Sequence, residues 1–253
     1  MTLAPVTAAV LLIGDELLSG RTHDLNLRTI AKFLAPLGVE VSEARVVADI
    51  PHAIIEAVNA LRGQYDYVFT TGGIGPTHDD KTADSVAAAF GVSIGVRADA
   101  RAVLEAHYKS VTLNDARLRM ARIPEGAALI ANPVSRAPGF QLGNVFVLAG
   151  VPSIMRGMLE DVAGRIQGGA VVKARTVRGR GVREGDIAAS LEALEHAAPG
   201  VAFGSYPWFS PDGYGVHLVA RSADPTALAK AGADLVALIR ARGAEPEEVD
   251  EST

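Results

Sequence analysis

The strongest constraint on the fold is the alternation of short strand-forming runs with amphipathic segments over residues 8–90. The runs expected as strands are Ala8–Ile13, Val39–Val47 and Tyr67–Thr71. Apolar residues recur at helical spacing in the segments that follow these runs, at residues 24–37, 50–62 and 82–90. Strands that are joined through helices pair in parallel with right-handed crossovers. The pattern therefore predicts an α/β fold with a mostly parallel sheet.

The chain after residue 90 continues this pattern and then changes at a pair of glycines. Residues 99–122 and 153–166 are expected to be helical, and short strands are expected at Ala127–Ile130 and Val145–Ala149. The pair Gly168–Gly169 marks a break, after which strands and helices alternate in a smaller α+β unit. We therefore expect an α/β domain over residues 1–168, a small α+β domain over 169–243 and a frayed acidic tail over 244–253.

Composition narrows the classes of function. The formal net charge is −5, and nothing in the sequence demands the basic face that a nucleic-acid-binding protein shows. The chain has no cysteine, which excludes disulfides, thiolate catalysis and cysteine-ligated zinc. Its apolar N-terminal stretch lacks a basic leader, and no apolar run reaches the roughly 18 residues of a membrane span. We expect a soluble cytoplasmic protein with neither nucleic-acid nor membrane partners.

The segment Gly72–Thr82 carries the strongest chemical signal, because it leaves an apolar strand and enters a helix. Three glycines let backbone N–H groups approach an anion, and Thr77 and Thr82 add hydroxyl donors. The helix directs its positive end to the same place. Asp79 and Asp80 would repel a phosphate unless a cation lies between them, so a phosphate site with Mg²⁺ is predicted. The alternative is a glycine-rich turn in which Asp80 caps the helix.

Other loops that follow strands carry weaker signals. Asp15 and Glu16 follow the first strand, and they suit a ligand hydroxyl, a metal or a helix cap. Asp49 follows the second strand, where ligands bind in parallel sheets, although an aspartate before Ile-Pro also suits a cap. The Gly- and Pro-containing loops at residues 132–139 and 150–153 either line the pocket or only turn the chain.

Two individual side chains each allow two interpretations of their role. His78 is either a proton-transfer group or a solvated loop side chain. Trp208, which we expect on a loop, either stacks on a planar ligand or packs between the two domains.

At these residues the chain resembles the molybdopterin-binding (MoCF) domain family, and within it the N-terminal region of the CinA proteins. The resemblance covers residues 8–166. The motifs that carry it are Gly14–Gly20, Asp49, Gly72–Thr82, Ala137–Phe140 and Gly150–Ser153. Gly204–Pro207 is similar to a motif of the smaller domain that follows in the same family. The resemblance implies a three-layer α/β/α domain, a homodimer or homotrimer, and a phosphorylated pterin or nucleotide as ligand.

The loop chemistry and the resemblance together assign the site residues. The catalytic groups are expected at Asp49 and Asp80, and the ligands of a divalent metal at Asp49, Asp79 and Asp80. The residues expected to bind the phosphorylated ligand are Gly14, Asp15, Glu16, Asn26, Gly72, Gly73, Gly75, Thr77, Thr82, Ser135, Pro138, Gly139, Gly150 and Pro152. Ser135 and Arg136 replace the Gly and Thr that are usual in the family, a change that would admit a different anion.

Relatives in this subgroup resemble metal-dependent pyrophosphatases of ADP-ribose or FAD, which implies the same hydrolysis here. One alternative is a protein that binds molybdopterin or a nucleotide without turning it over. Another is a regulatory protein with a relict pocket. Because the sequence stops before the amidase domain of full-length members, deamidation of a nicotinamide nucleotide is not expected.

Overall fold

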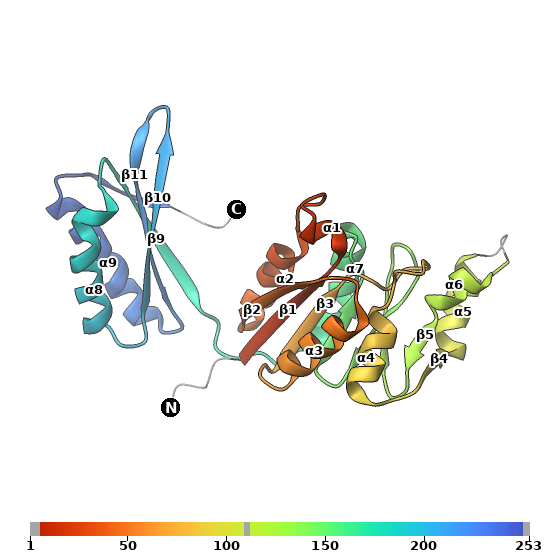
Figure 1. The fold of residues 1–253 in the computed structure, drawn as a ribbon. Coiled ribbons are helices and arrows are strands. Elements are labelled where there is room, and N and C mark those ends of the chain that lie inside the picture. The colour runs from red at the N-terminus through yellow and green to blue at the C-terminus, as the bar shows by residue number, and fades with distance from the viewer. Residues whose placement is uncertain (1–5, 109–111, 250–253) are drawn as a thin grey trace. The chain divides into compact units, whose positions relative to one another are not determined.

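The computed structural model describes residues 6–108 and 112–249. The chain divides into two compact units, Met1–Gly169 and Ala170–Thr253. Figure 1 traces the elements of each unit along the chain. Within the described ranges, no helix has both the length and the apolar character needed to cross a bilayer.

A six-stranded sheet forms the centre of the first unit, in the order β2-β1-β3-β8-β7-β6. The parallel strands are β2 (Val39–Val47), β1 (Val6–Ile13), β3 (Tyr67–Thr71) and β8 (Val145–Leu148). The antiparallel strands at one edge are β7 (Gly139–Leu142) and β6 (Ala128–Ile130). The predicted mostly parallel sheet is therefore confirmed.

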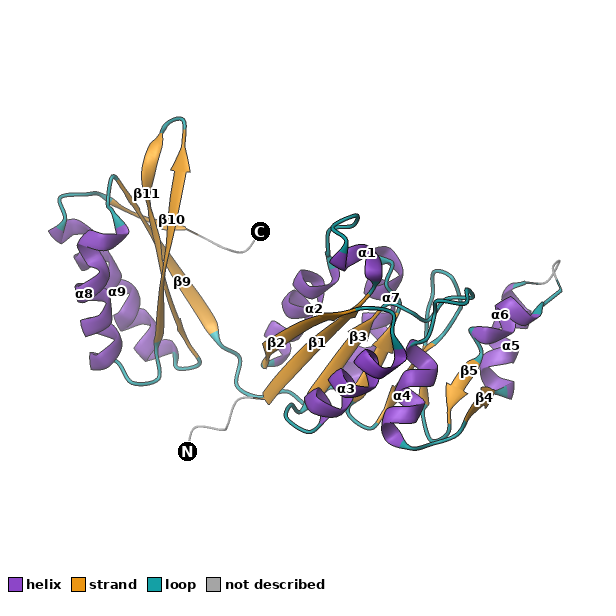
Figure 2. Cartoon of the chain, in the orientation of Figure 1, coloured by secondary structure: helices purple, strands orange, loops and turns teal. Residues whose placement is uncertain are grey.

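Helices cover both faces of this sheet, because side chains along each strand alternate between the faces. The helices of the first face are α3 (Pro51–Arg62) and α4 (Thr82–Phe90), and those of the second are α2 (Asn26–Leu34) and α7 (Pro152–Val162). The helix α5 (Ala98–His107) adds Ala100 and Leu104 to the apolar core of the first face. Short 3-10 turns at Ala35–Leu37 and Ala163–Arg165 extend α2 and α7. In β1, Leu11 faces the first layer and Val10 the second. The result is the expected three-layer α/β/α domain (Figure 2).

Residues 99–122 do not form the single helix that their pattern predicts. The segment instead continues α5 and then forms the short helix α6 (Asp115–Arg119) and the start of the strand β5 (Arg122–Pro124). β5 pairs with β4 (Ile94–Val96), and this pairing accompanies the burial of Ile123. Because the partner strand is distant in the sequence, helical periodicity could not predict it. Residues 109–111 of the expected helix lie outside the described residues.

The second unit is the predicted small α+β domain, built on a sheet in the order β10-β11-β9-β12. Its strands, all paired antiparallel, are β9 (Lys173–Arg180), β10 (Ala202–Ser210), β11 (Gly213–Ser222) and β12 (Pro246–Val249). Its helices are α8 (Glu184–Ala197) and α9 (Pro225–Ala241). Their apolar side chains share a core with Val177 and Leu218 of the sheet. Asp224 begins α9 by accepting backbone N–H groups of its first turn.

The expectation of a frayed tail over residues 244–253 is wrong for β12. Its residues pair with β9 through a backbone ladder. Glu247 lies 3.7 Å from Arg178, and Glu248 lies 4.0 Å from Arg175, so the acidic strand runs beside a basic one. Exposed ion pairs contribute little energy, and the ladder is the main reason that residues 246–249 form a strand, while residues 250–253 lie outside the described residues.

The two units have separate hydrophobic cores, so a core substitution in one unit should leave the stability of the other unchanged. Phe146 is fully buried in the first unit and stacks on Phe69 at 5.0 Å between ring centroids. Phe146→Ala should lower the stability of the first unit by about 3–5 kcal/mol, because it leaves a cavity. Trp208, the chain's single tryptophan, lies in β10 and reports on the second unit. Urea unfolding should therefore show an earlier far-UV circular dichroism transition and an unchanged fluorescence transition.

Leu218→Ala is the matched control, because Leu218 is buried in the core of the second unit. Leu218→Ala should shift the fluorescence transition to lower urea concentration and leave the unfolding of the first unit unchanged. Equal displacement of both transitions by either variant would contradict independent cores.

Candidate functional site

The carboxyl ends of the parallel strands bring distant loops together. The Gly14 N–H, after β1, donates to the carbonyl of Val47 at the end of β2. The Gly72 N–H, after β3, donates to the carbonyl of Leu148 at the end of β8. Most loops that the sequence singled out therefore lie at one edge of the sheet, as expected for a ligand site in an α/β fold.

The glycine loop after β3 is closed by the carboxylate of Asp80. One oxygen accepts the Gly75 N–H at 2.7 Å, and the other accepts the N–H and the hydroxyl of Thr77 at 2.8 and 2.6 Å. A Cβ at position 75 would lie 2.7 Å from an Asp80 oxygen, which explains the glycine. The sequence predicted that Gly75 and Thr77 bind a phosphate group. In the structure, the Gly75 N–H and the Thr77 N–H and hydroxyl donate to Asp80 instead. The alternative role of Asp80 as a helix cap is not seen either, since α4 begins after Lys81 without a side-chain cap bond.

The base of the same loop is held by Thr82. Its hydroxyl donates to the Gly72 carbonyl at 2.8 Å, and its N–H donates to the Gly73 carbonyl at 3.0 Å. Gly72 and Gly73 have φ of 104° and 67°, a backbone region that favours glycine. Because Thr82 is fully buried, the structure places this predicted ligand-binding residue as a clamp inside the loop.

Carboxylates gather at the ends of β1 and β2. The Asp15 N–H donates to the Asp49 carboxylate at 2.9 Å, and the Asp49 N–H lies 3.4 Å from an Asp15 oxygen. Burial raises the pKa of Asp49, and the negative charges of Asp15, Glu16 and Asp79 raise that pKa further. The site therefore concentrates negative charge where the sequence expected a cation.

The three expected metal ligands are not assembled as a set. Across the described part of the chain, no group of three or more His, Cys, Asp or Glu side chains is placed to hold a metal ion. Asp80 uses both of its oxygens within the loop. Mg²⁺ is commonly held by one or two carboxylates together with ligand phosphates. Asp49 and a neighbouring carboxylate could hold Mg²⁺ in that open way. The described residues do not form a site in which protein side chains alone surround the ion.

The loop after β8 is tied to α2. The amide of Asn26, a buried side chain, donates to the Gly150 carbonyl at 2.7 Å. Its own oxygen is buried without a hydrogen-bond partner among the described residues. Pro152 occupies the first turn of α7, where a missing N–H costs nothing. Asn26 is thus a predicted ligand-binding residue whose buried acceptor is unused.

The loop 132–139 is organised by a buried asparagine. The Asn132 amide donates to the Ser135 hydroxyl at 2.6 Å, and its oxygen accepts the Ser135 N–H at 3.0 Å. Gly139 packs so closely on Val147 and Met158 that a side chain could not fit. Ser135 and Gly139 therefore shape the loop, and Pro138 lines a pocket.

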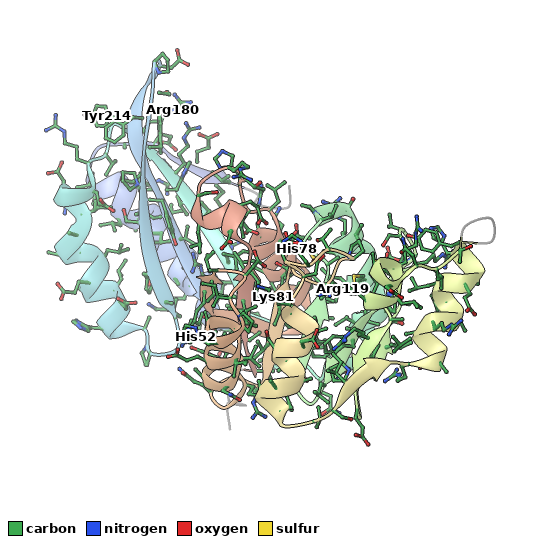
Figure 3. The ribbon with its side chains drawn as sticks, turned by 45° about the vertical axis from the view of Figure 1, so that its right-hand side comes forward. His52, His78, Lys81, Arg119, Arg180 and Tyr214 are labelled. Carbon is green, nitrogen blue, oxygen red and sulfur yellow. The ribbon has the colours of Figure 1, made fainter. Side chains whose placement is uncertain are left out.

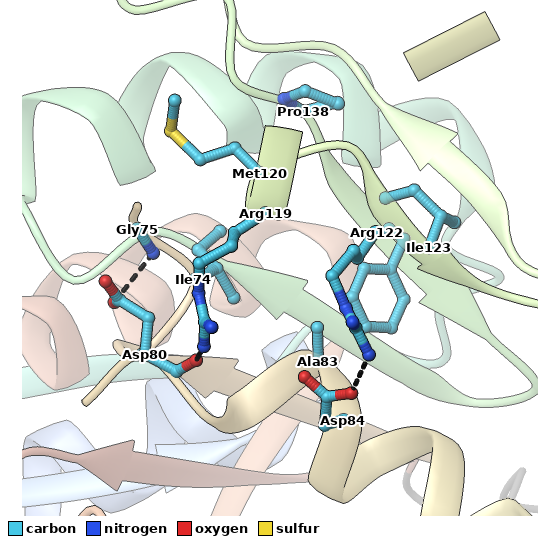
Figure 4. Close-up of a pocket in the computed structure, with 12 residues that line it drawn as sticks. Ile74, Gly75, Asp80, Ala83, Asp84, Arg119, Met120, Arg122, Ile123 and Pro138 are labelled. Carbon is cyan, nitrogen blue, oxygen red and sulfur yellow. Dashed lines mark hydrogen bonds and ion pairs between the residues drawn. The ribbon is translucent and has the colours of Figure 1, made fainter. Parts of the chain in front are cut away.

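This small pocket lies between the glycine loop, the start of α4 and the segment from α6 to β5 (Figure 4). Two arginines in its wall, Arg119 and Arg122, were missed by the sequence reasoning. The segment was expected to be one helix, and nothing in its local pattern directs these side chains toward the glycine loop. Figure 3 shows Arg119 together with His78 and Lys81 of the loop. The His78 side chain is 97% exposed, which fits a solvated residue.

Trp208 lies in β10 and not on the expected loop. Its ring stacks near His217 at 6.3 Å between centroids, and the Arg178 guanidinium lies 4.2 Å from the ring centre. Contacts with side chains of its own sheet therefore explain the position of the Trp208 ring.

Comparison with known proteins gives two family matches. A model described as "Probable molybdopterin binding domain" matches residues 9–167, and one described as "FAD synthase, middle domain" matches residues 180–248. A CinA-like protein of Gemmatimonas aurantiaca is 34% identical over 212 residues, which are 78% of this chain and 50% of that protein. A protein of Pyrobaculum calidifontis is 34% identical over 211 residues, which are 79% of this chain and 80% of that protein.

A solved structure of similar fold is described as the protein CinA with unknown function from Thermoplasma acidophilum. It is 34% identical, covers 64% of this chain and 99% of its own, and has a TM-score of 0.60. The chain spans about half the length of the curated CinA-like relatives that it matches, such as the 48% of the Citrifermentans bemidjiense protein.

The role of Asp80 as a loop closure is testable. Asp80→Ala removes three hydrogen bonds to a charged acceptor and should cost about 1–3 kcal/mol of stability. Hydrogen exchange should show faster exchange of the Gly75 and Thr77 amides. Asp79→Asn is the control, because Asp79 accepts neither amide, and it should leave both rates unchanged. Unchanged rates in Asp80→Ala would refute the closure.

The raised pKa of Asp49 predicts a pH-dependent stability. In the folded chain the Asp49 carboxyl gives up its proton less readily than in the unfolded chain. Its charged form therefore lowers stability as pH rises through the folded pKa, and it has no effect at acid pH, where both states hold the proton. Asp49→Asn should raise the Tm in metal-free buffer at pH 7, with the gain vanishing near about pH 3. A gain that is equal at both pH values would point to a different cause.

Proposed function

The chain belongs to the molybdopterin-binding domain family and to its CinA-like branch, and from this membership we propose that it is a metal-dependent pyrophosphatase of a nucleotide such as ADP-ribose or FAD. The main support for this proposal is a cluster of carboxylates around Asp49, which lies at the same edge of the sheet as the glycine loop. The pKa of Asp49 is raised within this cluster. Crowded negative charge beside a loop suited to phosphate favours a ligand that arrives with a cation.

The proposed reaction is hydrolysis of the bond between two phosphate groups. Water attacks one phosphorus, the bridging P–O bond breaks, and the two products are phosphate monoesters. ADP-ribose would give AMP and ribose 5-phosphate, and FAD would give AMP and FMN. Catalysis of this kind depends mainly on positioning and charge neutralisation, which rigid loops at the ends of strands supply.

The roles follow from the contacts. The first turn of α4 and the backbone at Gly73 and Ile74 are nearest to the pocket and suit a phosphate oxygen, whereas the Gly75 N–H is held by Asp80. Asp49, with Asp15 or Asp79 beside it, would hold the metal or orient the attacking water. Bound Mg²⁺ would supply charge neutralisation for the phosphate oxygens. Asp80 acts by keeping the loop closed.

A second candidate is a protein that binds molybdopterin or a nucleotide without turning it over. One observation favours it. The Asp80 carboxylate, which was expected to be catalytic, is engaged by donors within its own loop. Under either function, we propose a cytoplasmic protein that works as a homodimer or homotrimer on a phosphorylated small molecule.

The first experiment combines thermal stabilisation with product analysis. ADP-ribose, FAD, AMP and a molybdopterin precursor are each added with and without Mg²⁺, and every stabilising compound is tested for release of AMP. Metal-dependent stabilisation with AMP release supports the pyrophosphatase. Stabilisation without a product supports the binding protein.

Asp49→Asn separates the two roles further. It should lower turnover at least about 100-fold while ligand stabilisation persists, because it removes a charge at the reacting centre. Asp66→Asn is the matched control, since Asp66 precedes β3 and binds the Thr7 N–H. It should retain full turnover. Full turnover in Asp49→Asn would refute the assigned role.

A further inference from the structure

The pocket beside the glycine loop has a cationic wall. Four segments enclose it, and the side opposite the loop carries Arg119, at the end of α6, and Arg122, at the start of β5. Figure 4 shows both side chains extending from that segment toward Asp80 and Asp84. Two guanidinium groups therefore face the start of α4 and the glycine loop across one small space.

The two arginines differ in their partners. Arg122 pairs with the carboxylate of Asp84. Arg119 makes one long bond, from a terminal nitrogen to the backbone carbonyl of Asp80 at 3.3 Å. Among the described residues, no carboxylate forms an ion pair with Arg119. The charge of Arg119 is thus the least compensated of the charges that line the pocket.

Both arginines also have an unused donor. The Nε atoms of Arg119 and Arg122 are buried and have no hydrogen-bond partner among the described residues. Buried N–H donors are nearly always paired in folded proteins. A guanidinium offers its donors in a planar fork that matches two oxygens of a phosphate group. Two such forks in one pocket point to an oxyanion as the natural acceptor.

The rest of the lining strengthens this interaction. Side chains without charge make up much of the wall, namely Ile74, Met120, Ile123, Pro138 and Phe140. An apolar surround lowers the local dielectric constant and strengthens the attraction between a guanidinium and an anion. The carboxylates of the lining oppose an anion less than their number suggests, because Asp84 is paired with Arg122 and Asp80 faces the donors of its own loop.

We propose that Arg119 and Arg122 form a second anion subsite, which receives one phosphate group of a diphosphate ligand while the glycine loop and the start of α4 receive the other. This inference rests on the proposed function and deepens it. It makes the site selective for compounds with two linked phosphate groups over phosphate monoesters, because a monoester engages only one subsite. It also lets the monoester products leave more readily than the substrate.

The test measures the affinities of ADP-ribose and AMP by titration calorimetry with Mg²⁺ present, and every chain compared carries Asp49→Asn so that ADP-ribose is not hydrolysed during the titration. Arg119→Gln should weaken ADP-ribose binding about 10- to 100-fold, the range for losing hydrogen bonds from a charged group, and should change AMP binding less than about 3-fold. Arg119→Lys keeps the charge without the planar fork and should lie between wild type and Arg119→Gln. Arg101→Gln is the control, because Arg101 pairs with Glu105 on the exposed side of α5, outside the pocket.

The outcomes separate this inference from the proposed function. If wild type binds ADP-ribose and Arg119→Gln binds it equally well, the subsite is refuted and the proposed function stands. If Arg119→Gln weakens AMP and ADP-ribose by the same factor, the arginines hold the first phosphate group, and the assignment to a second group is refuted. If wild type binds neither compound and does not bind FAD either, the proposed function fails and this inference fails with it.

Discussion

The parallel register of β1, β2, β3 and β8 is the constraint on which the site depends. Parallel pairing brings the carboxyl ends of these strands to one edge, so the loops after them meet. The approach is close enough that a side chain at Gly72 would overlap the backbone of Ile13. The position of the glycine loop therefore follows from the sheet, and residues such as Thr82 lock it there.

Charge is distributed unevenly around this edge. Carboxylates gather near Asp49, and guanidinium groups lie on the far side of the glycine loop at Arg119 and Arg122. A metal-bound phosphate ester is complementary to both regions, because the cation suits the acids and the phosphate oxygens suit the arginines. Under the proposed function, the carboxylates would hold the cation and the arginines would bind phosphate oxygens.

The glycine loop shows where sequence reasoning reached its limit. Its residues are those of a phosphate cradle, and the loop does lie between a strand and a helix as predicted. The structure nevertheless gives the donors of Gly75 and Thr77 to Asp80, which is a neighbour within the same loop. A residue pattern shows which groups are available, and it does not show which acceptor lies nearest to each donor.

Hydrophobic periodicity and glycine breaks are local properties, and they were enough to predict the mostly parallel α/β sheet, the small α+β domain and the loops at the strand ends. Three features became visible only in the folded chain: the pairing of β4 with β5, the pairing of β12 with β9, and the placement of Arg119 and Arg122 beside the glycine loop. These features arise from contacts between segments that are distant along the chain. Such contacts are fixed by packing and backbone pairing in three dimensions, which leave no periodic trace in the sequence.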